Sequence, residues 1–153
     1  MSIADIRKDY QLKSLSEQEV DQNPFAQFSV WWNEAVQSDI IEVNAMALST
    51  VTSTGKPSSR IVLLKGYDEQ GFVFFTNYSS DKGRQLMQNH FAALLFFWKE
   101  LERQVRIEGV VSKVSEEESD AYFNNRAVGS RLGAWASPQS QKISDREVLN
   151  NEL

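Results

Sequence analysis

The sequence predicts a mainly β domain, in which an antiparallel sheet closes into a small barrel and α-helices pack outside it. Five segments of β-type composition follow one another at short spacing, mostly joined by hairpin-type turns. The chain has no β-α-β rhythm and no glycine-rich phosphate loop, which disfavours a Rossmann domain. Its 153 residues, 41% of them hydrophobic, suffice for one domain with a substantial core.

Each predicted helix opens on a recognisable start signal. An asparagine followed by proline precedes the first helix, in which apolar residues recur at helical spacing. Serine near the cap marks the second, and Ser-x-x-Glu capping boxes mark the last two. The predicted helices span residues 24–38, residues 79–87, a stretch from Ser115 through Arg126, and a stretch that starts at Ser144.

The predicted strands are residues 45–52, 58–65, 72–76, 91–98 and about 101–114. Turn-forming residues separate the first three, at 53–57 and, as a hairpin loop, at 67–71. In the last strand the apolar alternation changes phase near Gly109, which predicts a β-bulge or a strong bend there.

Composition excludes several kinds of chemistry. The chain contains no cysteine, so disulfides, thiolate nucleophiles, iron–sulfur clusters and Cys-ligated zinc are excluded. A single histidine, His90, disfavours a histidine-based metal cage, and we expect no metal site. No Gly-x-Ser-x-Gly nucleophile elbow is present. The chemistry must therefore come from hydroxyls, carboxylates, Arg, Lys or a borrowed cofactor.

Charge and hydropathy narrow the class of partner. The net charge of −5 disfavours nucleic-acid binding. The longest apolar run, Phe91–Trp98, is too short to cross a membrane, and the N-terminus lacks an apolar signal core, so we expect a cytoplasmic protein. Residues 60–131 carry 10 Lys and Arg against 10 Asp and Glu, whereas the remainder of the chain is acidic. The cations therefore gather in the middle of the chain.

Four groups of residues could bind a ligand, and each also has a purely structural interpretation. The strand Arg60–Lys65, which begins and ends with a cation, could simply end in solvent. The helix start with hydroxyl side chains at residues 76–80 could be a helix cap that binds no ligand. A charged strand face could be solvated, and a Tyr–Arg–Ser set that suits a phosphate monoester could be an ordinary surface pair. The groups are Arg60–Lys65; Thr76, Asn77, Ser79 and Ser80 with Lys82; Glu102–Glu108; and Tyr122, Arg126 and Ser130.

Taken together and in order, these groups resemble the pyridoxamine/pyridoxine 5′-phosphate oxidase family, from about Ile6 to Leu149. The resemblance implies an FMN-binding split barrel, mainly β with peripheral helices. It also implies a homodimer with two FMN sites at the subunit interface. The matching stretches are Arg60–Lys65, Phe75–Asn77, Leu101–Val105, Tyr122 and Phe123 with Arg126, and Ser130–Ser140.

The resemblance also implies the site residues. The expected FMN-binding residues, some supplied by the partner chain, are Arg60, Ile61, Val62, Leu63, Leu64, Lys65, Phe75, Thr76, Lys82, Gln104, Gln139 and Ser140. The expected contacts to the substrate phosphate are Lys65, Tyr122, Arg126 and Ser130. No residue of this chain is assigned as catalytic.

The implied reaction is the FMN-dependent oxidation of pyridoxamine or pyridoxine 5′-phosphate to pyridoxal 5′-phosphate, in vitamin B6 biosynthesis and salvage. A hydride passes from C4′ to flavin N5, and oxygen reoxidises the flavin to give hydrogen peroxide. The cofactor would supply the difficult step, while the protein orients the ligands and neutralises charge. Two alternatives stay open: a non-catalytic FMN- or pyridoxal-phosphate-binding protein on the same barrel, and a structural module without a ligand.

Two departures from the family accompany the resemblance. The family usually has Arg-Lys where this chain has Asp81-Lys82, so a carboxylate replaces one cation at the flavin phosphate. The family also continues beyond Leu153, with a Trp and an Arg at the flavin and an Arg-x-His pair at the substrate. We therefore expect an N-terminal segment over 1–22, a barrel domain over 23–153, and a missing C-terminal part of the family's chain.

Overall fold

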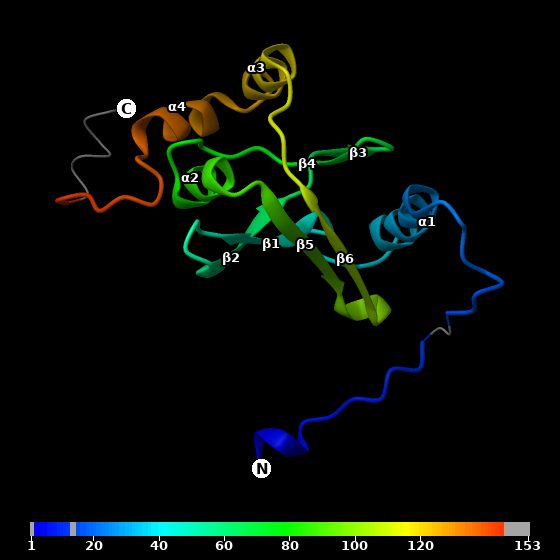
Figure 1. Cartoon of the computed structure of the whole chain (residues 1–153). Helices are drawn as coiled ribbons and strands as arrows, with labels where there is room; N and C mark the ends of the chain where they lie inside the picture. Colours follow the sequence, from blue (N-terminus) through cyan, green and yellow to red (C-terminus); the bar gives the residue numbers. More distant parts are fainter. Residues whose placement is uncertain (1, 13–14, 146–153) are drawn as a thin grey trace.

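The computed structural model describes residues 2–12 and 15–145 and contains two antiparallel sheets (Figure 1). The larger sheet has the strand order β2-β1-β5-β6, and the smaller one pairs β3 with β4. Edge strands β2 and β6 do not pair with each other, so the sheet stays open, as in a split barrel. The strands are β1 (Ala45–Val51), β2 (Pro57–Leu63), β3 (Gly66–Asp68), β4 (Gly71–Val73), β5 (Phe91–Trp98) and β6 (Arg103–Val110).

The core lies between one face of the large sheet and helix α1 (Pro24–Val36). Alternation along β1 and β5 points Met46, Leu48, Phe96 and Trp98 to this face, each at most 2% exposed. Phe28 of α1 lies at the centre of the core. Its ring centroid is 4.8 to 6.1 Å from the rings of Tyr67, Phe72, Phe96 and Trp98. Helix α1 thereby fastens the β3-β4 hairpin to the sheet.

Three predicted helices are confirmed, and their caps explain where they begin. Asn23 Oδ1 accepts hydrogen bonds from the amides of Phe25 and Ala26 at the start of α1. Ser80 Oγ accepts from the Gly83 amide at the start of α2 (Asp81–Gln88). In the same way Ser115 caps α3 (Glu116–Asn124). A capping hydrogen bond joins neighbours in sequence, so these starts are readable from sequence alone.

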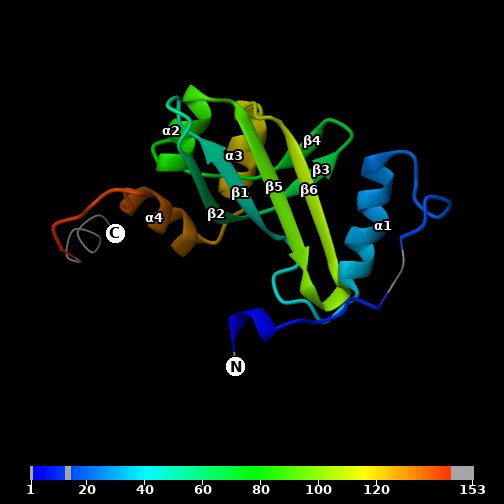
Figure 2. The ribbon, with the colours of Figure 1, turned by 60° about the horizontal axis from the view of Figure 1, so that its bottom comes forward.

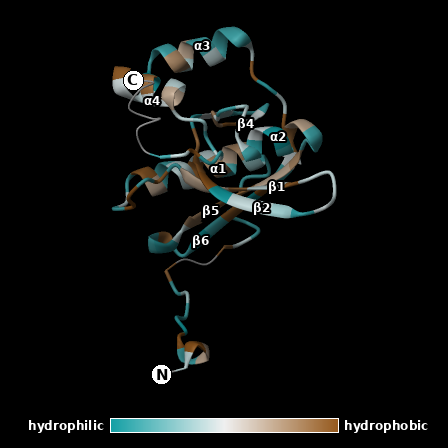
Figure 3. Cartoon of the chain, turned by 90° about the vertical axis from the view of Figure 1, so that its left-hand side faces the viewer, coloured by the Kyte–Doolittle hydropathy of each residue, from teal (hydrophilic) through white to brown (hydrophobic). Residues whose placement is uncertain are grey.

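A further helix, α4 (Val128–Ala136), was not predicted. Its first turn contains glycine, and no side chain caps its start, so it carries none of the usual signals. Helices α1 and α2 pack against the same face of the large sheet, because Phe28 and Ala35 of α1 and Leu86 of α2 belong to one core. Helix α2 lies near the start of β5 and α1 near its end (Figures 1 and 2). Helix α3, mostly hydrophilic, lies away from the sheet above α2 (Figure 3). The capping-box pattern at Ser144 leads into residues 146–153, outside the described residues.

Four strand predictions are corrected. The expected hairpin loop at 67–71 is shorter, because Tyr67 and Asp68 pair within β3. Strands β2 and β4 end at Leu63 and Val73, earlier than expected. No bulge interrupts β6, since its pairing with β5 is continuous from Trp98↔Arg103 to Phe91↔Val110. The change of phase near Gly109 instead marks the end of the strand.

The N-terminal segment is held to the sheet through Glu102. The amides of Gln11 and Leu12 donate to Glu102 Oε2 at 2.7 and 3.0 Å, and Lys8 Nζ lies 2.6 Å from Oε1. These contacts, the Lys8 hydrogen bond first, lower the pKa of Glu102. Glu102 itself has a left-handed backbone with φ of 51°. Among the described residues, no helix has the length and apolar character needed to cross a membrane.

Candidate active site

A cavity of about 1170 Å³ lies beside edge strand β2. Its walls come from β2, from the segment between β4 and α2, from the first turn of α2, and from α3, α4 and the residues that follow α4. The lining residues are Ile61, Val62, Leu63, Lys65, Phe75, Thr76, Asn77, Tyr78, Lys82, Ser119, Asp120, Tyr122, Phe123, Arg126, Ala127, Ser130, Gly133, Ala134, Trp135, Ser137 and Gln139.

The cavity gathers most of the residues that the sequence indicated. All four members of the expected substrate-phosphate set line it, although up to 65 positions separate them in the sequence. They bring two cations and two hydroxyls to one space. The cavity also contains these members of the expected cofactor set: Ile61, Val62, Leu63, Lys65, Phe75, Thr76, Lys82 and Gln139.

Four members of the cofactor set lie outside the cavity wall. Leu64 is 5% exposed and belongs to the core. Gln104 is exposed on β6, opposite Phe97 on the outer face of the sheet. Ser140 lies beyond α4, with φ of 65°. The guanidinium of Arg60 reaches instead into a polar network against β1 and α2.

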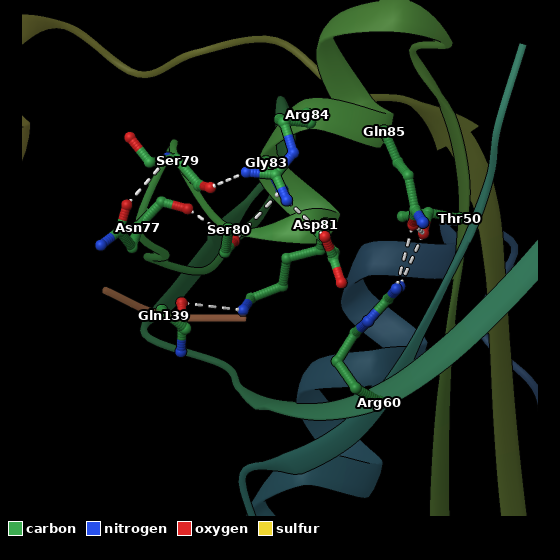
Figure 4. A network of polar contacts seen from close by, with 11 residues as sticks. Thr50, Arg60, Asn77, Ser79, Ser80, Asp81, Gly83, Arg84, Gln85 and Gln139 are labelled. Atoms are coloured by element: carbon green, nitrogen blue, oxygen red, sulfur yellow. Dashed lines mark hydrogen bonds and ion pairs between the residues drawn. The ribbon is translucent and has the colours of Figure 1, made fainter. Parts of the chain in front are cut away.

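The segment before α2 is shaped by hydrogen bonds within it. Ser80 Oγ donates to the carbonyl of Asn77 at 2.6 Å, and Asn77 Oδ1 accepts from the Ser79 amide at 2.8 Å (Figure 4). Gly83 is required here, because a Cβ at this position would lie 2.3 Å from the Tyr78 carbonyl oxygen. The first turn of α2 therefore packs directly on the backbone of the loop that forms the cavity wall.

Two groups at this end of the cavity fit a phosphate. Thr76 Oγ1 is buried and has no hydrogen-bond partner within the described part of the chain, so a ligand atom would satisfy it. Lys82 Nζ faces the same space and donates to Gln139 Oε1 at 3.1 Å. Burial and then the charge of Arg60 lower the pKa of Lys82, while Asp81 raises it. A phosphate group would supply the acceptor and the negative charge that these groups lack.

Two aromatic residues that line the cavity stack on each other. The rings of Phe75 and Tyr122 stack with centroids 3.7 Å apart and planes 3° from parallel. Lys65 Nζ lies 5.9 Å from the Tyr122 centroid. The stack joins α3 to the segment that follows β4, so it helps to close one wall of the cavity.

Sequence reasoning missed Thr50 and Gln85, which hold Arg60. Arg60 donates from Nη1 to Thr50 Oγ1 at 2.6 Å and from Nη2 to Gln85 Oε1 at 3.0 Å, and Thr50 Oγ1 donates to Gln85 Oε1 at 2.5 Å (Figure 4). The side-chain alternation of β1 places Thr50 on the core face with Met46 and Leu48, so its inward orientation could have been predicted from the sequence. Strand alternation could not have predicted its partner Gln85, which lies on α2. The network links β1, β2 and α2, and burial lowers the Arg60 pKa.

Fold and cavity together define an antiparallel split-barrel protein with a cation-bearing cavity beside its edge strand. Residues 32–152 match the family described as pyridoxamine 5′-phosphate oxidase. The chain therefore belongs to this family, which confirms the resemblance seen in the sequence.

Individual relatives agree with this assignment. The chain is 60% identical to the pyridoxine/pyridoxamine 5′-phosphate oxidase of Gloeothece citriformis, over 99% of this chain and 71% of the relative. It is 61% identical to pyridoxine/pyridoxamine 5′-phosphate oxidase 1 of Ralstonia nicotianae, over 97% of this chain and 70% of the relative.

Solved structures confirm the fold. PhzG from Burkholderia lata, in complex with tetrahydrophenazine-1-carboxylic acid, is similar with a TM-score of 0.85 and 31% identity, over 91% of this chain and 70% of PhzG. An FMN-binding protein from Nostoc punctiforme, related to pyridoxamine 5′-phosphate oxidase, has a TM-score of 0.60 and 19% identity, over 90% of this chain and 73% of that protein. The latter likeness concerns the fold alone.

Proposed function

We propose that this chain binds FMN in the cavity and oxidises pyridoxamine or pyridoxine 5′-phosphate to pyridoxal 5′-phosphate, with oxygen as electron acceptor. The observation that carries the proposal is the meeting of Lys65, Tyr122, Arg126 and Ser130 in one cavity with Thr76 and Lys82. This is a site with groups for two phosphates. The names of relatives at about 60% identity support the same substrates.

The cofactor is FMN, and its phosphate binds at the start of α2. Thr76 Oγ1 and Lys82 Nζ bind the phosphate oxygens, and Gln139 orients the Lys82 ammonium through their hydrogen bond. Ile61 and Leu63 supply apolar surface from β2. Arg60 does not line the cavity; its positive charge, held in place by Thr50 and Gln85, attracts the FMN phosphate from behind the cavity wall. When bound, FMN accepts the two electrons and the hydrogen removed from C4′ of the substrate and delivers the electrons to oxygen.

The substrate phosphate binds to the second group of residues. Arg126 presents a guanidinium that can donate two parallel hydrogen bonds to phosphate oxygens. Lys65 adds a second positive charge, and the hydroxyls of Tyr122 and Ser130 add two donors. These contacts orient C4′ for reaction, and such orientation lowers the barrier to hydride transfer.

The active form is a homodimer. Four large apolar side chains stand on the face of the large sheet that points away from the core, each more than half exposed in the single chain: Ile61, Phe91, Phe97 and Val110. Such a surface is typical of a subunit interface. Gln104 lies beside Phe97 on this face, which suits a residue that contributes to the partner's FMN site.

The test is the visible spectrum of the purified full chain. We expect a yellow protein whose flavin absorbance bleaches when pyridoxamine or pyridoxine 5′-phosphate is added without oxygen, and returns on aeration with release of hydrogen peroxide. A yellow protein that neither substrate bleaches would instead favour the non-catalytic binding protein. A colourless protein that FMN does not reconstitute would refute both.

A further inference from the structure

The first turn of α2 places one carboxylate among three cations. Asp81 Oδ1 accepts a hydrogen bond from Arg84 Nη2 at 2.5 Å, and Arg84 Nη1 donates to the carbonyl oxygen of Ser79 (Figure 4). Lys82 follows Asp81 directly and faces the cavity, and Arg60 approaches from β2. The carboxylate therefore lies at the same helix end as the groups that fit a phosphate.

Asp81 also acts electrostatically on the two cations that it does not contact. Its charge raises the pKa values of both Arg60 and Lys82, against the effect of burial. Asp81 in addition occupies the positive end of the α2 dipole, where an anion is stabilised. A phosphate bound by Lys82 and Thr76 would share this positive potential with Asp81 and be repelled by it.

Arg84 offsets this repulsion. Both terminal nitrogens of its guanidinium are fixed, Nη2 on Asp81 and Nη1 on the Ser79 carbonyl, so its charge is held beside the carboxylate. Its side chain does not line the cavity. Arg84 therefore acts on a bound phosphate without touching it: its positive charge neutralises Asp81 and attracts the phosphate from a distance.

We propose that Asp81 limits the affinity of this site for phosphorylated ligands and that Arg84, by pairing with Asp81, restores part of it. The inference rests on the proposed position of the FMN phosphate. It means that this chain binds its cofactor less tightly than its Lys and Arg content allows, and exchanges it more readily.

The experiment compares the full chain with its Asp81→Asn, Arg84→Gln and doubly substituted variants. Any bound flavin is first removed from the protein. FMN is then added, and the quenching of its fluorescence on binding gives the dissociation constant. Riboflavin, which lacks the phosphate, is titrated in the same way as the matched ligand. Thermal unfolding of each variant checks its folding. Removing a charge at a helix end changes binding of an anion roughly threefold. We expect Asp81→Asn to tighten FMN by about this factor, Arg84→Gln to weaken it similarly, and riboflavin affinity to stay constant.

The double variant tests the pairing. Arg84→Gln should have a smaller effect when Asp81 is already Asn, because Arg84 then has no carboxylate to neutralise. The gain from Asp81→Asn should also shrink in 1 M salt. Unchanged FMN affinity in Asp81→Asn, or an equal gain for riboflavin, would overturn the inference while leaving the proposed function intact.

A second probe separates the two proposals. If the wild-type chain binds neither flavin, the proposed function fails, and binding of inorganic phosphate is then measured by calorimetry. Tighter phosphate binding in Asp81→Asn would still support the role of Asp81. Equal binding in wild type and variant would overturn it.

Discussion

The ring of Tyr122 on α3 lies flat against that of Phe75, with centroids 3.7 Å apart and planes 3° from parallel. The family resemblance assigns these residues to different ligands, Phe75 to the cofactor and Tyr122 to the substrate phosphate. Their contact makes the two expected sites share one wall. A change at Tyr122 can therefore affect both ligands, depending on whether its ring or only its hydroxyl is removed.

Tyr122→Phe keeps the stack and removes one donor to the substrate phosphate. We expect KM for pyridoxine 5′-phosphate to rise roughly fivefold, as for the loss of one hydrogen bond, and FMN affinity to stay constant. Tyr122→Ala should raise KM further and also weaken FMN, because Phe75 loses its neighbour. Tyr78→Phe is the control, since Tyr78 lines the cavity but belongs to neither set. Equal effects of the two Phe variants would contradict the assignment of Tyr122.

Arg126→Ala should separate substrate binding from cofactor binding. Losing a charge-assisted contact to phosphate typically costs about 1.5–3 kcal/mol, so KM should rise tenfold or more. The dissociation constant of FMN should change far less. Lys99→Ala, which removes an exposed cation outside the cavity, serves as the control for net charge. Equal losses for substrate and FMN would show that Arg126 does not discriminate between the two phosphates.

Gln85→Leu should destabilise the fold and loosen Arg60. Without Gln85 Oε1, the fully buried Thr50 hydroxyl and the Arg60 guanidinium lose a shared acceptor, at a cost of about 1–3 kcal/mol in the free energy of unfolding. Urea unfolding measures this loss. Gln88→Leu, an exposed position of the same helix, should have little effect. Equal stability of the two variants would mean that the network contributes nothing measurable.

Gly83→Ala should disturb the phosphate end of the cavity. The new methyl group would meet the Tyr78 backbone, which cannot yield without moving the loop, so we expect a loss of about 1–3 kcal/mol in unfolding free energy and weaker FMN binding. Gly129→Ala on α4 is the control, because its methyl group meets nothing within 4 Å. A fully stable Gly83→Ala variant with normal FMN affinity would refute the close packing of α2 on this loop.

Acid should release the N-terminal segment. The contacts of Glu102 lower its pKa, so docking is more favourable above the ordinary value near 4.5 and is lost as the pH falls through the lowered value. Hydrogen exchange at the amides of Gln11 and Leu12 reports this release. Glu102→Gln should produce the same loss of protection at neutral pH, whereas Glu100→Gln should not. Undiminished protection of both amides in Glu102→Gln would contradict the docking.

The predictable parts of this structure depend on short-range contacts. Asn23 and Ser115 were recognisable as caps, and a serine near the start of α2 was too, because each cap bonds to an amide two or three residues away; in α2 the cap is Ser80. Strand β5 has the predicted bounds, since its apolar run is limited on both sides by polar residues. Helix α4 was missed because it has no capping side chain. Residue chemistry and spacing indicated four candidate groups, and the resemblance to the family gave those groups their expected ligands.

The sequence by itself determined which side chains are available for chemistry: no thiol, one histidine, and cations concentrated in residues 60–131. It also determined a mainly β pattern with capped helices. Only the tertiary structure decided what these residues face. One acceptor of Arg60, Gln85, lies 25 positions away on another element, and the amides bound by Glu102 lie 90 and 91 positions away. Such contacts depend on strand register and helix placement, which many distant residues set together. The same reason explains why only the folded chain reveals Asp81 among three cations.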